Sequence, residues 1–126
     1  MKTVNIPEGY QQIMPYLIVE NAAAFISFTQ KVFGATERLK TMRDEHTIMH
    51  AEISIGESVI MMADATDQFK QQNAGLFIYV DDCDSIFKKA LDNGGITVME
   101  PADQSYGRSG GLKDAFGNTW WITSIA

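Results

Sequence analysis

The feature that most constrains the fold of this chain is an internal repeat at an offset of 61 residues. At this offset Gly34 aligns with Gly95, and Gly56 aligns with Gly117. The polar residues that could cap two helices align at the same offset. Because one offset matches helix starts, helix ends and late turns together, the sequence indicates two copies of one supersecondary unit.

Each copy has the same order of segments, a strand followed by a helix and then three strands. Asn21 and Asp82 suit the N-caps of the two helices, and Gly34 and Gly95 suit their C-terminal ends. Apolar runs bounded by turn residues predict the strands. The expected helices are 22–33 and 83–93, and the expected strands are 16–19, 37–43, 47–55, 58–63, 76–80, 96–99 and 118–124. The stretch 100–111, rich in Pro, Gly and Ser, is expected to be a loop or a broken strand.

The length of 126 residues suits a single α+β domain, residues 1–126, in which both copies share one core. We expect the first copy to span 14–64 and the second 75–125, with the polar stretch 65–74 as the linker between them. A chain of this length buries roughly two thirds of its unfolded surface, so it needs neither disulfides nor a structural metal. Cys83, the single cysteine, cannot form an internal disulfide.

Charge and hydropathy limit the expected partners. The formal net charge of −6 disfavours binding to nucleic acid through a broad basic surface. No apolar run approaches the roughly 20 residues that span a bilayer, and the N-terminal sequence lacks the apolar stretch of a signal peptide. We therefore expect a cytoplasmic protein that binds neither nucleic acid nor membrane.

Several stretches carry a resemblance to a known family. ENAAAFISFTQKVFGATE spans the first predicted helix, and DAFGNTWWIT leads into the last strand. With the βαβββ repeat, they resemble the glyoxalase/bleomycin-resistance/dioxygenase superfamily, also called the vicinal oxygen chelate superfamily. HAEISIGESVIMMAD and YGRSGGLKDAFGNTWW look most like its PhnB-like branch. Thr29 and Ala115 depart from the family pattern, in which Tyr and Pro are usual.

The resemblance extends from about Met14 to Ile125 and implies a glyoxalase-like architecture. Two tandem βαβββ modules would form a curved mixed sheet around an open cavity, with the helices on the convex face. It also implies a homodimer. Because this fold supports lyases, epimerases, dioxygenases and binding proteins, the resemblance does not specify one activity.

Metal-using members of the family hold a divalent cation with four His, Gln or Glu side chains, two from each module. Matched residue by residue, these positions fall on Met14, Ile60, Gly75 and Trp121. None of them offers a ligand for Zn, Ni, Mn or Fe, and a shift of one residue restores none. We predict no metal and no other cofactor. Either the apolar side chains line a cavity for a flat or apolar organic molecule, or they fill the space.

The strand 47–55 contains a pair of residues suited to acid–base chemistry. His50 and Glu52 share its more polar face, and we expect that face to line the cavity together with Ile60. This requires a three-residue turn with Gly56 in a left-handed bulge, because a two-residue turn at Gly56-Glu57 would put Ile60 on the opposite face. His50 would then be a general base or an orienting donor, with Glu52 as its partner. The alternatives are a solvent-exposed pair or a contact between subunits.

Three further residues are candidates for ligand binding. Tyr106 and Arg108 lie in the predicted loop, where Arg108 either orients an anionic group of the ligand or points into solvent. Trp120 and Trp121 should lie on opposite faces of the last strand. We assign Trp121 to the cavity, where it would stack on a flat ligand, or else it is part of the core.

These observations predict a protein that binds a small, partly apolar organic molecule in a metal-free cavity. The alternative is a superfamily enzyme of lyase, isomerase or dioxygenase type. It would use His50 acid–base chemistry or a divalent metal at a site that the family does not use. A third possibility is an interaction module whose sheet face is buried in a dimer. The ligand-contacting residues of the first hypothesis are Met14, Ile60, Tyr106, Arg108 and Trp121, with His50 and Glu52 supplying polarity.

Overall fold

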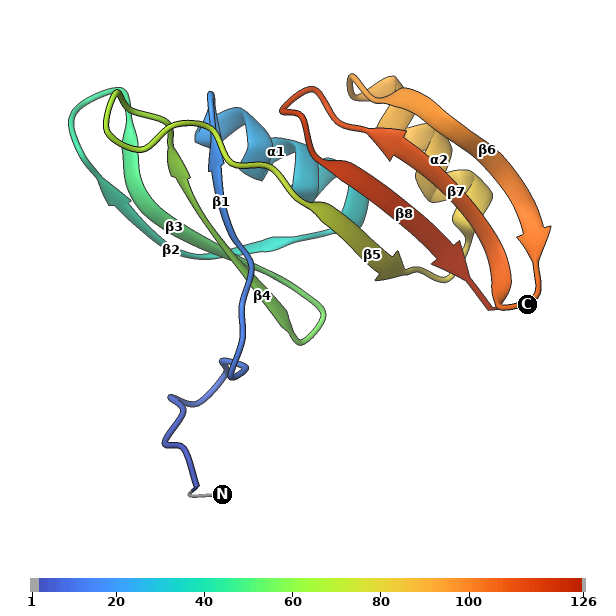
Figure 1. Cartoon of the computed structure of the whole chain (residues 1–126), viewed down its shortest axis with the longest axis horizontal. Helices are drawn as coiled ribbons and strands as arrows, with labels where there is room; N and C mark the ends of the chain where they lie inside the picture. The colour runs from blue at the N-terminus through green and yellow to red at the C-terminus, as the bar shows by residue number, and fades with distance from the viewer. Residues whose placement is uncertain (1–2, 126) are drawn as a thin grey trace.

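The computed structural model describes residues 3–125 as two four-stranded mixed sheets, each with one helix packed on one face (Figure 1). The first module contains β1 (Tyr16–Val19), α1 (Ala22–Phe33), β2 (Thr36–Met42), β3 (Ile48–Ile55) and β4 (Ser58–Asp64). The second contains β5 (Gly75–Tyr79), α2 (Cys83–Asp92), β6 (Ile96–Gln104), β7 (Gly107–Lys113) and β8 (Thr119–Ser124). The strand orders β1-β4-β3-β2 and β5-β8-β7-β6 are equivalent. The predicted α+β fold of two tandem βαβββ modules is confirmed.

Both helices begin where the sequence predicts; α1 also ends there, and α2 ends at Asp92, one residue before its predicted end. The side chain of Asn21 accepts a hydrogen bond from the backbone N–H of Ala24, and the side chain of Asp82 accepts one from that of Ser85. These bonds satisfy donors that have no partner within the first turn of a helix. Gly34 ends α1 with a φ of 70°, a left-handed conformation that glycine adopts without steric cost.

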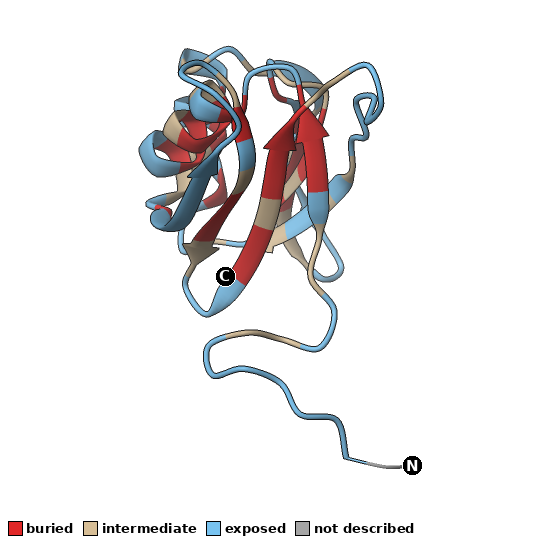
Figure 2. Ribbon diagram, turned by 90° about the vertical axis from the view of Figure 1, so that its left-hand side faces the viewer, coloured by how far each residue is buried: buried red, intermediate tan, exposed pale blue. Residues whose placement is uncertain are grey.

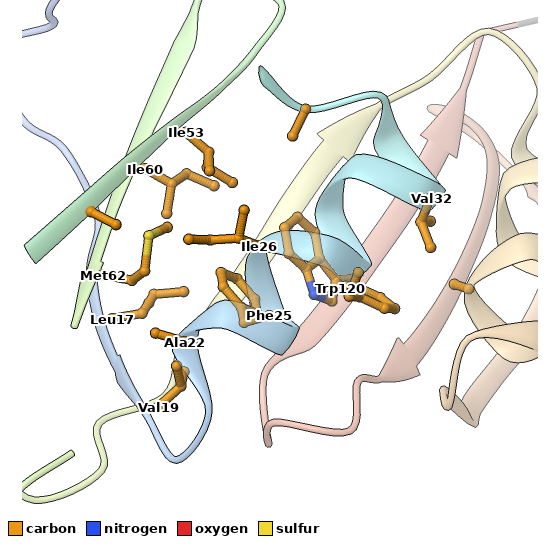
Figure 3. Close-up of a cluster of buried hydrophobic side chains, with 14 of the residues drawn as sticks. Leu17, Val19, Ala22, Phe25, Ile26, Val32, Ile53, Ile60, Met62 and Trp120 are labelled. Carbon is orange, nitrogen blue, oxygen red and sulfur yellow. The ribbon is translucent and has the colours of Figure 1, made fainter. Parts of the chain in front are cut away.

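The two modules share one hydrophobic core, which forms around α1. The ring of Phe33 at the end of α1 lies 4.5 Å from the indole of Trp120 in β8, and Phe116 packs edge-on against Phe25 and Phe28. Figure 3 shows Trp120 beside α1, among side chains of the first module. Burial is concentrated in the middle strands and on the inner side of the helices, whereas the N-terminal segment is exposed (Figure 2). Folding of one module therefore depends on contacts with the other.

A buried carboxylate organises the turn before β8. Asp114 is 4% exposed and accepts hydrogen bonds from the backbone N–H groups of Phe116 and Asn118. Its second oxygen accepts bonds from the Asn118 amide and from the indole N–H of Trp120. The same carboxylate therefore fixes the turn and orients the large core side chain that follows it.

Of the two expectations for 100–111, the loop is wrong and the broken strand is closer to the structure, because this stretch forms most of a β6–β7 hairpin with irregular pairing. Two register shifts in β6, on either side of Met99, break the regular ladder before and around Pro101. Such irregularities let a proline, which has no N–H donor, lie within a strand at the edge of a sheet. Gly110 and Gly111 let the ring of Phe87 pack on one face of β7 and that of Trp121 on the other.

Neither helix within residues 3–125 combines the length and the apolar character that a bilayer crossing requires.

Candidate functional site

The turn between β3 and β4 places Ile60 differently from the prediction. Ile55 pairs with Ser58, so the turn has only two residues, and Gly56 has a φ of 58°. Ile53 therefore pairs with Ile60 on the helix-covered face, where Figure 3 shows both beside Ile26. The three-residue turn, and with it the placement of Ile60 on the face of His50, is wrong. Glycine at the first central position already allows a two-residue turn, so no extra residue is needed.

The face of the first sheet that points away from α1, here called the first open face, carries a chain of hydrogen bonds. The Tyr16 hydroxyl lies 3.0 Å from Nδ1 of His50, and Nε2 of His50 lies 2.8 Å from Oε2 of Glu52. Tyr10, from the segment before β1, donates its hydroxyl to Oε1 of Glu52. His50 and Glu52 are thus brought together as predicted, and two tyrosines extend the pair at its two ends.

Glu52 is the buried member of this chain, with 5% of its side chain exposed. Burial is the largest influence and raises its pKa, but the hydrogen bonds from Tyr10 and His50, with the charges of His50 and Arg38, outweigh it. The pKa of Glu52 is therefore below its ordinary value, and the group is a carboxylate at neutral pH. The hydrogen bond to this carboxylate raises the pKa of Tyr10, and burial raises that of Tyr16. Both phenols are therefore protonated at neutral pH.

The N-terminal segment is anchored to the first open face by side chains. The Gln11 amide donates to the carbonyl of Val59 and accepts from its N–H, which extends the β1–β4 ladder before the start of β1. The Arg38 guanidinium stacks over the Tyr10 ring, 4.6 Å from its centre, and donates to the carbonyl of Gly9. A hollow of about 410 Å³ lies beside this anchor. Its lining comprises Val4, Asn5, Ile6, Pro7, Tyr10, Gln11, Gln12, Met14 and Met61.

The corresponding open face of the second sheet is aromatic. As predicted, Trp120 is buried beneath the helices and Trp121 lies on the opposite face, where its ring covers Gly111. The rings of Phe77 and Tyr79 lie 5.2 Å apart, and Tyr106, in the β6–β7 turn, lies 6.4 Å from Phe77. Phe77, Tyr79 and Tyr106 are all more than half exposed.

Arg108 lies in β7, and acidic side chains of the same module already engage it. Its guanidinium donates two hydrogen bonds to Asp84, at 3.0 and 3.2 Å, and one to Asp103 at 3.3 Å. These bonds raise the pKa of Arg108 further above its ordinary value. An anionic ligand would have to compete with both carboxylates, so the geometry does not favour the predicted role of Arg108 as an anion-orienting residue.

A cleft of about 490 Å³ lies between the two sheets, where the start of β4 faces β5. Both modules contribute to it, and Ile60 lines it although the residue is only 7% exposed. The lining residues are Gln11, Pro15, Ile55, Gly56, Ser58, Val59, Ile60, Leu76, Phe77, Ile78, Tyr79 and Trp120. Met14 and Trp121 were also predicted to line a shared cavity, but neither lines this cleft. Met14 lines the hollow beside Tyr10, whereas Trp121 lies over Gly111.

Sequence reasoning missed Tyr10, Tyr16 and Met61. Tyr16 alternates with the buried residues Leu17 and Val19, which is a signal that it shares the face of His50. Met61 pairs with Tyr16 in the way that Trp121 pairs with Phe77, so Met61 rather than Ile60 occupies the family's metal-ligand position in β4. No local pattern brings Tyr10 to Glu52, because a loop precedes β1.

The residues present do not fit the divalent metal that the family implies. With the corrected register, the four matched positions hold Met14, Met61, Gly75 and Trp121, which supply no imidazole or carboxylate. Within residues 3–125, no three His, Cys, Asp or Glu side chains come together in a group that could hold a metal ion. We therefore derive no chemical step from a metal at these positions.

Comparison with known proteins agrees with the fold. An uncharacterized protein of Mycobacterium bovis is 29% identical over 120 residues, covering 86% of this chain and 79% of the relative. A PhnB protein from Bacillus cereus superposes with a TM-score of 0.72 at 20% identity, covering 91% of this chain and 100% of that one. The fosfomycin resistance protein FosX from Listeria monocytogenes superposes with a TM-score of 0.73 at 16% identity, covering 92% and 94%. At these identities the two structures show the fold alone.

The model of one family matches residues 9–122, which is nearly the whole chain. This match, the two equivalent βαβββ modules and the structural similarities agree. The chain belongs to the Glyoxalase/Bleomycin resistance protein/Dioxygenase superfamily.

Proposed function

We propose that this protein binds a small, uncharged and largely apolar organic molecule in the cleft between its two sheets, without a divalent metal. The observation that supports this function is the lining of the cleft. Leu76, Ile78 and Trp120 come from the second module, and Val59 and Ile60 come from the first. A volume of about 490 Å³ lies within the usual range of small-molecule sites, which are mostly apolar with a few polar groups.

The charge of the lining favours a neutral ligand. Among residues 3–125, none of those that line the cleft is an Asp, Glu, Lys, Arg or His. A charged group placed there would lose its hydration without gaining an opposite charge, which is costly. Ser58, Tyr79 and Gln11 are the lining residues with a hydroxyl or amide side chain, and Gln11 is already bonded to Val59. These few groups could orient a ligand whose affinity comes mainly from apolar contact.

The rim of the cleft offers an aromatic surface for a flat ligand. Phe77 is 52% exposed and lies against Tyr79, with an angle of 74° between the rings. Exposed aromatic rings at the mouth of an apolar cleft give a stacking surface in addition to area burial. The proposed ligand class is therefore a neutral molecule with at least one aromatic or flat unsaturated ring.

Titration with Nile red, an uncharged dye that fluoresces in apolar surroundings, tests this function. We expect saturable binding with one dye per chain. The change Phe77→Ala should weaken it about threefold to tenfold, because one stacking contact of about 0.5–1.5 kcal/mol is lost. Tyr106→Ala is the matched control, since Tyr106 is also 52% exposed and lies near Phe77 but does not line the cleft. Equal weakening by both changes, or fluorescence that rises without saturation, would contradict the proposal.

A further inference from the structure

We propose that the first open face is a second ligand site, specific for a small molecule with an acidic hydroxyl, such as a phenol or an enol. Its hydroxyl proton would pass through Tyr16 to His50. This inference goes beyond the binding function proposed for the cleft, because none of Tyr16, His50 and Glu52 lines that cleft. It rests on the direction of the hydrogen-bond chain, the exposure along it and the surrounding side chains.

The Glu52 carboxylate, at one end of the hydrogen-bond chain, defines the direction of the hydrogen bonds. Because Glu52 is ionised, Nε2 of His50 carries a hydrogen and donates it to Oε2. In the neutral imidazole Nδ1 is then an acceptor, and the Tyr16 hydroxyl donates to it across 3.0 Å. Within the described part of the chain no group donates to the Tyr16 oxygen, so its lone pairs can accept a hydrogen bond from a bound hydroxyl.

Along the hydrogen-bond chain, solvent exposure decreases from Tyr16, on the proposed ligand side, to Glu52. Tyr16 is 46% exposed, the His50 side chain is 26% exposed, and the Glu52 side chain is 5% exposed. Tyr10 binds the second oxygen of Glu52, so both carboxylate oxygens are engaged. A buried carboxylate that holds the far nitrogen of a histidine fixes its tautomer and stabilises the imidazolium when a proton arrives. The arrangement therefore has an accessible end and a charge-stabilising end.

The surroundings of Tyr16 suit an aromatic ring with an anionic oxygen. Met61 is the register partner of Tyr16, and Met61 and Met14 line the 410 Å³ hollow beside Tyr10. Thioethers make favourable contacts with aromatic rings. The charges that act on Tyr16 are those of Arg43 and Glu52, which have opposite effects on its pKa, and the charge of Arg38 acts on Tyr10 and Glu52. The two cations would favour the ligand anion over the neutral hydroxyl, whereas the carboxylate of Glu52 opposes it from the buried end of the hydrogen-bond chain.

The proton transfer balances without any further reactant. The ligand hydroxyl gives its proton to the Tyr16 oxygen while the phenolic proton of Tyr16 moves to Nδ1 of His50. The products are the ligand oxyanion and an imidazolium that still donates from Nε2 to Glu52. Tyr16 is a neutral phenol before and after the step. The site would thus hold a phenol or an enol as its anion, which is the nucleophilic form of such a molecule.

The test uses 4-nitrophenol, whose anion absorbs visible light while the neutral phenol does not. At a pH equal to the pKa of the free phenol, saturating wild-type protein should raise the anion-to-phenol ratio about tenfold, the effect of a one-unit shift caused by nearby opposite charges. Tyr16→Phe removes the hydroxyl but keeps the ring, and His50→Gln keeps polar contacts but cannot take the proton. Both variants should leave the ratio of bound probe close to that of free probe. Circular dichroism confirms that each variant is folded.

Two controls separate this proposal from the function of the cleft. Tyr79→Phe removes an exposed phenol at the cleft rim and should leave the anion ratio unchanged. Phe77→Ala should weaken Nile red binding but not the nitrophenol effect. An unchanged ratio at saturating wild-type protein would overturn the proposal, as would an anion ratio that Tyr16→Phe fails to reduce. Neither outcome bears on the cleft, which Nile red reports separately.

Discussion

Asp114→Ala is expected to lower the free energy of unfolding by about 3 kcal/mol, because four donors lose one common acceptor. Asn118 and Trp120 are 0% and 1% exposed, so the Asn118 amide and the indole N–H have no contact with bulk water that could compensate for the carboxylate. The backbone N–H of Phe116 is nearer the surface and should lose less. Urea denaturation followed by circular dichroism measures the change.

Asp103→Ala is the matched control for this change. The Asp103 side chain is 88% exposed and makes a single hydrogen bond to Arg108 at 3.3 Å. An exposed ion pair of this kind contributes little, so the control should lose no more than about 0.5 kcal/mol. A loss for Asp114→Ala as small as that of the control would mean that the turn before β8 does not depend on its carboxylate.

Trp120→Ala is expected to lower the free energy of unfolding by about 3–5 kcal/mol, the range found when large buried aromatic side chains are truncated. Trp120 is 1% exposed and lies between Phe33 of the first module and the second sheet. Its loss opens a cavity at the boundary of the modules and also removes a donor from Asp114. The two modules should still unfold in one transition, because residues of both form one core.

Trp121→Ala serves as the comparison for this prediction. Trp121 is next in the sequence but lies on the open face of the second sheet, where it is only partly buried and covers Gly111. We expect it to lower the free energy of unfolding by about 1 kcal/mol, near the average for point mutations in general, because Trp121 is partly buried. If the two alanine variants were equally stable, the assignment of Trp120 to the inside and Trp121 to the outside would be contradicted.

Local sequence signals predicted the order of elements because each copy carries its own caps and turns. Asn21, Gly34 and Asp82 act through neighbours a few residues away, so their effect can be read without the tertiary structure. The β6–β7 hairpin was missed for the opposite reason. Pro101, Gly110 and Gly111 are typical of loops, and only their packing against Phe87 and Trp121 makes a strand pair of them.

The candidate sites depended on register, which the sequence specifies weakly. A difference of one residue in the length of the β3–β4 turn places Ile60 either on the face that α1 covers or on the face of His50. With the observed two-residue turn, Ile60 lies on the face that α1 covers. A register shift between β2 and β3 also interrupts the alternation at Met49, so that Ile48 is buried and Met49 is exposed. The prediction that His50 and Glu52 share a face is correct because both residues lie beyond this irregularity. The contact between Tyr10 and Glu52 could not be predicted from local sequence patterns, because the two residues are 42 positions apart.

The central claim is that the cleft between the sheets binds a neutral aromatic molecule, and NMR of the two indole N–H groups tests it most directly. The chain has two tryptophans, so the spectrum of Trp121→Phe identifies the Trp120 signal. Trp120 lines the cleft and Trp121 does not. On titration with Nile red, we predict that the Trp120 signal shifts and saturates with the dye fluorescence, while the Trp121 signal stays in place. A shift of Trp121 with Trp120 unmoved would show that the dye binds elsewhere and would contradict the claim.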